Sequence, residues 1–322
     1  MENKPVEIFI LSGFLGSGKS TLLKELIQLE KKVGRRIGVL MNELGDISID
    51  SSIIPADIPL KEMLNGCICC TIQGELSLQL NSILEEYDLD AIYIEATGVA
   101  HPLEIMDACT HPKLANKVVM KAILTVVNAK QWHENRLSIK LKKLLAEQVK
   151  YADMILINKI DQVSQTELEL IRESIGQVNA KAIISSVQFG KIHPSLLYGE
   201  GQQQMETATK LLENDHHESH VHHHLHVRTF SVPVNQPIDR IQFTHWLERI
   251  QGQLYRAKGF IYLTETPGLF LFNYAYGDLI LERYPTEKPL QPVLVCIGEN
   301  LERESIEQGI SHLQQSQTKM TL

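Results

Sequence analysis

Short apolar runs and amphipathic stretches alternate along the first 200 residues of the chain. The apolar runs are rich in Ile, Val and Leu, as in strands that are buried on both faces of a sheet. They occupy residues 6–11, 37–41, 91–94, 123–127, 154–157 and 182–184. Helical periodicity appears between most of them, at residues 21–30, 75–87 and 137–151 and in a segment that begins with the capping box of Ser164 and Glu167. This alternation predicts an α/β fold, a mostly parallel sheet with helices on both faces.

The pattern changes near residue 200. Residues 201–226 are polar, poor in strand-forming residues and dense in histidine, which predicts a linker. Later segments predict strands at residues 226–233, 259–264, 269–274 and 292–297 and helices at 238–251 and 301–313. We therefore expect a first domain over residues 1–200, a linker over 201–226, and a smaller α+β domain with an antiparallel sheet over 227–322.

Composition and charge narrow the class of protein. Of the 322 residues, 43% are hydrophobic and 22% are charged, which is enough apolar material for two cores. The formal net charge of -8 disfavours a nucleic-acid partner, because such affinity comes from clustered Lys and Arg. The N-terminus lacks a secretion signal, and no apolar run reaches the roughly 20 residues that span a bilayer. We expect a cytoplasmic protein that binds neither nucleic acid nor membrane.

A phosphate-binding motif follows the first predicted strand. Residues 13–21 satisfy G-x-x-x-x-G-K-[ST] between a strand and a helix, the context that the motif requires. Its glycines let backbone N–H groups surround phosphates, the lysine reaches the terminal phosphates, and the serine hydroxyl holds Mg²⁺. A glycine-rich turn that contains Lys-Ser by chance is the alternative, which the flanking elements disfavour. The predicted residues are Gly13, Gly16, Ser17, Gly18, Lys19, Ser20 and Thr21.

Two further segments lie at the ends of predicted strands, at the sheet edge where such folds bind ligands. Asn158, Lys159 and Asp161 form N-K-x-D, and the aspartate would accept hydrogen bonds from guanine but face the wrong pattern on adenine. Glu95 predicts a second Mg²⁺-holding acid, and the turn with Thr97 and Gly98 would lie near the γ-phosphate. A capping or turn role is the alternative for Glu95.

A cysteine cluster suggests a transition-metal site. Cys67, Cys69 and Cys70 offer three thiolates, soft ligands that suit Zn²⁺ or Cu⁺. Alternate positions of a strand point to opposite faces, so the three need not bind one ion, and a fourth ligand must come from elsewhere. A redox-reactive pair is the competing interpretation. Cys109 and Cys296, by contrast, are predicted to be small core residues.

The predicted linker is a second candidate metal site, because seven of the chain's 13 histidines lie within it. Neutral imidazoles bind divalent ions, so this tract could collect metal. A solvated linker with incidental affinity is the alternative. The seven residues are His216, His217, His220, His222, His223, His224 and His226.

These motifs occur in the order found in one known family. With residues 13–21, the Asn42-Glu43-Leu-Gly45 segment, the cysteine run, residues 95–98 and residues 158–161, the chain resembles the CobW-type P-loop GTPases, relatives of the hydrogenase and urease nickel-insertion GTPases. Residues 256–260 also resemble that family's C-terminal module, so the likeness covers nearly the whole chain.

The resemblance implies a GTP-dependent metallochaperone that delivers an ion, often zinc and in some branches cobalt, to a client protein. It makes the three clustered cysteines metal ligands, with Asp46 and His111 as auxiliary ligands. Some family members carry an acid two residues before the Glu of N-E-x-G, where this chain has Met41, so a ligand from that position is missing. Thiolate ligands bind Zn²⁺, Co²⁺ and Ni²⁺, so the cysteines alone do not identify the ion.

The resulting hypothesis joins the two sites. GTP and Mg²⁺ would order residues 42–70 into metal-binding geometry, and hydrolysis to GDP would release the ion. Lys19, Mg²⁺ and the loop amides would stabilise charge, with Glu95 holding the Mg²⁺. Glu43, or Asp46, would orient the attacking water. Two rivals stay open: a metal-storage protein with vestigial nucleotide binding, and an ATP-dependent small-molecule kinase. The oligomeric state is also open, with a homodimer as one candidate.

Overall fold

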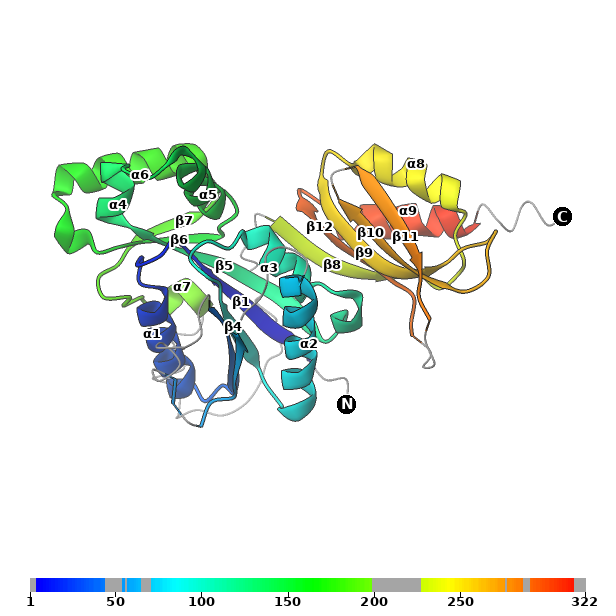
Figure 1. The fold of residues 1–322 in the computed structure, drawn as a ribbon, viewed down its shortest axis with the longest axis horizontal. Helices are drawn as coiled ribbons and strands as arrows, with labels where there is room; N and C mark the ends of the chain where they lie inside the picture. The colour runs from blue at the N-terminus through cyan, green and yellow to red at the C-terminus, as the bar shows by residue number, and fades with distance from the viewer. Residues whose placement is uncertain are drawn as a thin grey trace, which may run out of the picture.

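The computed structural model describes residues 4–43, 54, 55, 57–64, 71–198, 227–275, 277–285 and 290–315. Its first sheet has seven strands in the order β3-β2-β4-β1-β5-β6-β7, and each pair of neighbours runs parallel (Figure 1). The strands are β1 (Val6–Ser12), β2 (Ile37–Glu43), β3 (Leu60–Leu64), β4 (Ala91–Glu95), β5 (Val118–Asn128), β6 (Met154–Asn158) and β7 (Ile183–Ser186). The predicted parallel α/β sheet is confirmed.

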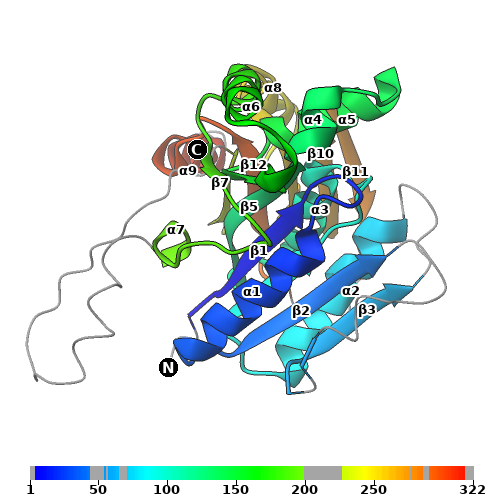
Figure 2. The same cartoon turned by 90° about the vertical axis from the view of Figure 1, so that its left-hand side faces the viewer.

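Helices cover both faces of this sheet (Figure 2). On one face, α1 (Lys19–Lys32) packs Leu22 and Leu26 against Phe9 and Val39. The short helix α7 (Ser195–Tyr198) also contributes to that core. The opposite face carries α2 (Thr71–Glu86), α3 (Pro102–Cys109), α4 (Ala129–Glu134), α5 (Ile139–Lys150) and α6 (Gln165–Val178). The sheet is therefore the middle of three layers, as its apolar strands require.

A second, antiparallel sheet lies beyond the predicted linker, in the order β11-β10-β9-β12-β8. Its strands are β8 (Val227–Pro233), β9 (Leu254–Tyr262), β10 (Leu269–Ala275), β11 (Asp278–Arg283) and β12 (Val293–Glu299). The helices α8 (Arg240–Ile250) and α9 (Arg303–Gln315) cover one face, where Phe243 and Ile310 pack against Ala257 and Ile261. Within the described parts of the chain, no helix is long and apolar enough to cross a bilayer.

Several elements lie outside the sequence predictions. The strands β3 and β11 lie at sheet edges and carry charged residues such as Lys61 and Glu282, so neither forms an apolar run. The short helices α3 and α4, with 8 and 6 residues, are too brief for periodicity to show. The strand predicted at residues 259–264 begins at Leu254, because Arg256 and Lys258 interrupt its apolar pattern.

The two sheets meet at one face of the second. Alternation along β9 turns Ala257 and Ile261 toward α8 and α9, so Arg256 and Lys258 face the first domain. Val227 and Ile297 of the second sheet belong to the same core cluster as Ile8 of the first. The first domain thus covers part of the face that the helices leave open, around β8, β9 and β12, while Asn273 and Ile280 on the same face stay exposed.

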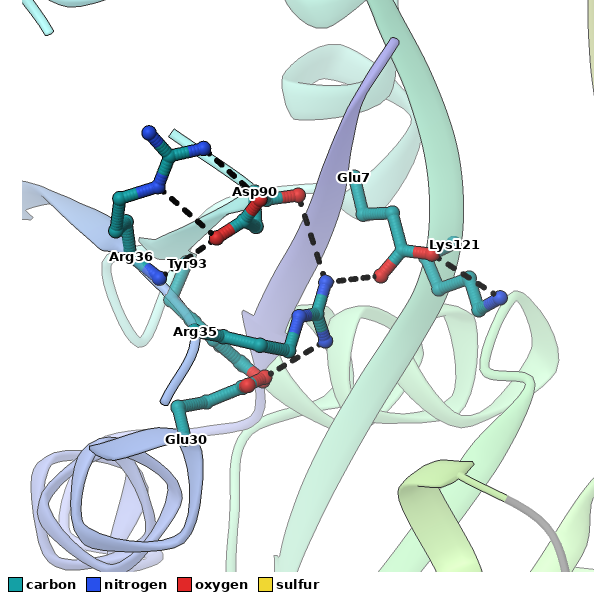
Figure 3. A network of polar contacts seen from close by, with 7 residues as sticks. All are labelled: Glu7, Glu30, Arg35, Arg36, Asp90, Tyr93 and Lys121. Atoms are coloured by element: carbon teal, nitrogen blue, oxygen red, sulfur yellow. Dashed lines mark hydrogen bonds and ion pairs between the residues drawn. The ribbon is translucent and has the colours of Figure 1, made fainter. Parts of the chain in front are cut away.

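A buried acidic residue fixes the end of α1 to the sheet (Figure 3). The side chain of Glu30 is fully buried, and its Oε1 accepts hydrogen bonds from the Tyr93 hydroxyl at 2.5 Å and from Arg35 Nη1 at 3.2 Å. Arg35 also pairs with Glu7 at 2.5 Å, and Glu7 lies 3.4 Å from Lys121 Nζ. This network lies at the amino edge of the sheet, opposite the loops that follow the strands. We assign it to stability.

Replacing Glu30 by Gln should lower the free energy of unfolding by about 2 kcal/mol, because charge-assisted hydrogen bonds to buried partners are lost. Urea or thermal unfolding of the full chain measures the change. Asp57→Asn is the matched control, since Asp57 pairs with Lys31 on the surface, where both side chains are exposed. The assignment would be wrong if the two variants unfolded at the same midpoint.

Candidate nucleotide and metal site

The phosphate loop leaves the carboxyl end of β1 and enters α1 at Lys19. Gly18 has a φ of 108°, a left-handed backbone conformation that disfavours side chains. A Cβ at Gly18 would also lie 2.3 Å from Nδ2 of Asn158. Position 18 therefore requires glycine, both because of its backbone conformation and because Asn158 of the N-K-x-D segment lies so close.

The lysine of the loop lies against its own backbone. Lys19 is buried, and its Nζ donates to the carbonyl oxygens of Gly13 at 3.0 Å and Phe14 at 3.4 Å. The ammonium group is thus held at the centre of the loop, among backbone groups. A buried cation at this position suits the terminal phosphates of a nucleotide.

The two predicted Mg²⁺ ligands lie side by side. The hydroxyl of Ser20, in the first turn of α1, donates to Oε1 of Glu95 at 2.8 Å. Glu95 is the last residue of β4 and is largely buried. A hydroxyl and a carboxylate form a pair of hard oxygen donors, which fits Mg²⁺. The residues present therefore fit the ion that the motif implies.

The segment predicted to recognise the base is joined to the predicted phosphate loop. Asn158, the last residue of β6, donates from Nδ2 to the Ser17 carbonyl at 2.9 Å. Its Oδ1 is buried and accepts no hydrogen bond from the described residues. Lys159 has a φ of 59°, and Asp161 lies exposed in the 3₁₀ turn Ile160–Gln162. The turn places the aspartate beyond the strand end, at the same edge as the phosphate loop.

The loop after Glu95 is fixed by a residue that the sequence motifs do not include. Nε2 of Gln148, in α5, donates to the carbonyls of Gly98 at 3.2 Å and Ala100 at 3.1 Å. Gln148 is fully buried, and its backbone carbonyl accepts from the Thr125 hydroxyl at 2.9 Å. The Ala100 N–H closes a turn to the Thr97 carbonyl at 3.0 Å. A glutamine within an amphipathic helix gives no sequence signal of this role.

Most of the predicted transition-metal ligands lie outside the described residues. These are Asp46, Cys67, Cys69, Cys70, His216, His217, His220, His222, His223, His224 and His226. The backbone of Glu43 ends β2, but its side chain is outside the described part. Met41 is a buried core residue beside Glu95 in the sheet register.

The ends of the cysteine segment are nevertheless described. β3 ends at Leu64, and α2 begins at Thr71. Because β3 runs parallel to β2, its carboxyl end lies at the sheet edge that also carries the phosphate loop. The cysteine segment therefore starts from the nucleotide-binding edge.

His111 lies apart from that edge, at the domain junction. Its Nδ1 accepts from the Lys113 N–H at 3.2 Å. Burial, with the nearby charges of Lys258 and Lys113, lowers the pKa of His111 to about 4, so its imidazole is neutral. Among the described residues, no three His, Cys, Asp or Glu side chains are grouped to hold a metal.

Cys109 and Cys296 are buried thiols, as predicted. Burial raises the pKa of both, that of Cys296 to about 12, which keeps them protonated. They act as small apolar residues rather than as metal ligands.

Two family models cover most of the chain. Residues 7–186 match the model described as "CobW/HypB/UreG, nucleotide-binding domain", and residues 227–314 match "Cobalamin synthesis protein cobW C-terminal domain". The chain belongs to the CobW/HypB/UreG family. The buried Lys19, the Ser20–Glu95 pair and the Asn158 contact are thus parts of a nucleotide-binding domain of that family.

Curated relatives of this CobW-family chain carry zinc in their names. The "Zinc chaperone YjiA" of Escherichia coli strain K12 is 28% identical over 324 residues, 96% of this chain and 99% of its own. The "Zinc-regulated GTPase metalloprotein activator 1" of Dictyostelium discoideum is 26% identical over 342 residues, 88% of this chain and 71% of its own. The crystal structure of Zn(II)-bound YjiA GTPase from E. coli covers 96% of this chain and 99% of its own, with 22% identity and a TM-score of 0.45.

Gly98→Ala should weaken nucleotide binding about tenfold, or about 1.4 kcal/mol. A Cβ at Gly98 would lie 2.6 Å from the backbone N and the side chain of Leu15, so the phosphate loop would have to move. Titration with a fluorescent nucleotide measures the affinity. Gly176→Ala, in open space on helix α6, is the control and should leave the affinity unchanged. Equal affinities for both variants would contradict the close packing of the two loops.

Proposed function

We propose that this CobW-family chain is a GTP-hydrolysing metallochaperone that binds zinc and delivers it to a metal-requiring client protein. One observation carries the proposal. The candidate nucleotide residues and the end of β3, from which the cysteine segment starts, share one edge of the parallel sheet. The names of the relatives, a zinc chaperone and a zinc-regulated GTPase metalloprotein activator, support the choice of cargo.

Hydrolysis would depend mainly on positioned charge. Ser20 and Glu95 would hold Mg²⁺, and the ion would supply positive charge beside the β- and γ-phosphates. Lys19 would turn from its own carbonyls to the terminal phosphates, and the N–H groups of the glycine-rich loop would bind the remaining oxygens. The attacking water would be oriented by Glu43 or Asp46, from the loop that follows β2.

The zinc site would be built from thiolates. Cys67, Cys69 and Cys70 would supply soft ligands, and Asp46 could complete a tetrahedral set. His111 is left out of this set because it lies at the domain junction, apart from the edge where the cysteine segment starts. The histidine tract would collect ions at lower affinity. Co²⁺ and Ni²⁺ suit similar ligands, so availability would decide between them and zinc. Thiolate ligands must stay reduced, which favours a cytoplasmic location.

GTP would control zinc through the segment between the two sites. Residues 42–70 run from the end of β2, beside Glu95, to the start of α2. Contacts to the γ-phosphate and Mg²⁺ would hold this segment in the metal-binding arrangement, and hydrolysis would remove those contacts.

Zinc should bind at least about tenfold more tightly with a non-hydrolysable GTP analogue than with GDP, a typical size for coupling between sites. Competition against a chelating dye measures both affinities on the full chain. Replacing the three clustered cysteines by serine should abolish the difference, whereas Cys109→Ser should retain it, because Cys109 is buried away from that edge. Equal zinc affinities with the two nucleotides would rule out the proposed control.

Asp161→Asn should weaken GTP binding about 100-fold and favour xanthosine triphosphate instead. The amide would place a donor where guanine also has a donor, but where xanthine has a carbonyl acceptor. Nucleotide competition measures this shift. Asp278→Asn, at an exposed position in the second sheet, is the control and should leave nucleotide choice unchanged. Unchanged GTP affinity in the Asp161 variant would leave the guanine assignment without its main support.

A further inference from the structure

A buried ion cluster joins the two domains. Asp107, in the last turn of α3, is fully buried, and its Oδ2 lies 2.7 Å from Arg256 Nη1 and 2.6 Å from Lys258 Nζ. Both cations belong to β9 of the second sheet and are mostly buried. One carboxylate therefore holds two cations across the junction, in surroundings where little water screens them.

Such a cluster is costly unless it serves a purpose. Removing ions from water costs several kcal/mol each, and hydrophobic residues of similar size often stabilise a protein equally well. In addition, Asp107 Oδ1 accepts no hydrogen bond, and Arg256 Nε donates none, among the described residues. The cluster fixes the orientation of the two elements more than it adds stability.

The start of α3 is tied to the same strand of the second domain. His101, which caps α3 by accepting from the Leu103 N–H, lies 5.5 Å from the Tyr151 ring, centroid to centroid. Tyr151 in turn makes an edge-on contact, at 6.1 Å, with Tyr255 of β9. The end of the helix thus contacts β9 directly, through Arg256 and Lys258, and its start is linked to the same strand indirectly, through the Tyr151 ring and Tyr255.

The helix also follows directly on the loop beside the phosphate site. Only residues 96–101 separate Glu95, at the end of β4, from Pro102, the first residue of α3. Figure 1 shows α3 on the side of the first domain that faces the second sheet. Every residue of α3 except Glu104 is buried, so the helix can shift only as a unit. A change in its position must move the loop that contains Gly98.

We propose that Asp107 is a positioning residue, through which the C-terminal domain holds α3, and with it residues 97–100, in the arrangement that receives the γ-phosphate. The inference rests on the proposed function, because it assumes that the site distinguishes GTP from GDP. It assigns a role to Arg256 and Lys258, which belong to the segment that resembles the family's C-terminal module. Within the first domain, Gln148 holds residues 97–100 through its hydrogen bonds to the Gly98 and Ala100 carbonyls.

The test compares nucleotide affinities of full-length variants in the presence of Mg²⁺. Asp107→Asn should weaken binding of a non-hydrolysable GTP analogue about fivefold or more while leaving GDP affinity within about twofold. Lys258→Met, on the other domain, retains the Arg256 pair and should cause a smaller change in the same direction. It also keeps the test open if the Asp107 variant fails to fold.

The control separates positioning from stability. Glu30→Gln removes a buried carboxylate from the first domain at the opposite edge of the sheet, so it should lower stability without changing the ratio of the two affinities. The inference is overturned if Asp107→Asn and Lys258→Met change both affinities equally or not at all, or if Glu30→Gln changes the ratio as much. A wild-type chain that binds neither guanine nucleotide would instead refute the proposed function.

Discussion

The contact between Ser20 and Glu95 is the constraint on which the rest of the arrangement depends. It joins the first turn of α1 to the end of β4, the strand that pairs with β1, at the carboxyl edge where such sheets bind ligands. A carboxylate kept at a largely buried strand end is expensive unless a cation or donor satisfies it. Glu95 is also the residue from which the chain continues, through residues 96–101, into α3 and the domain junction.

Buried charged side chains lie at both edges of the first sheet and at the domain junction, and we assign them different roles. At the amino edge, the Glu30 network is closed by donors within the first domain and contributes to stability. At the carboxyl edge, Lys19 donates to carbonyls of its own loop and Glu95 accepts from Ser20, where we propose that phosphates and Mg²⁺ bind. The Asp107 cluster stands between the domains and links that second edge to the C-terminal sheet. The role that we assign to each cluster depends on the groups that its buried charges contact.

The sequence predicts the parallel sheet and the nucleotide motifs well, because both depend on local patterns. Apolar runs identify the central strands, and glycines with Lys19 and Ser20 identify the phosphate loop without any knowledge of packing. The edge strands β3 and β11 are harder, since their charged, half-exposed residues resemble loops. Gln148 and Asp107 are invisible in the sequence, because their roles arise only when α5 and α3 are packed against distant segments.

Nucleotide and metal would bind at two coupled sites, and coupling between sites is reciprocal. The most direct measurement is therefore the ratio of GTP-analogue to GDP affinity of the full chain, with and without saturating Zn²⁺. Zinc should raise the preference for the GTP analogue by the same factor by which the analogue raises zinc affinity. A ratio that zinc leaves unchanged would contradict the account, because it would show that the cysteine segment and the phosphate loop act independently.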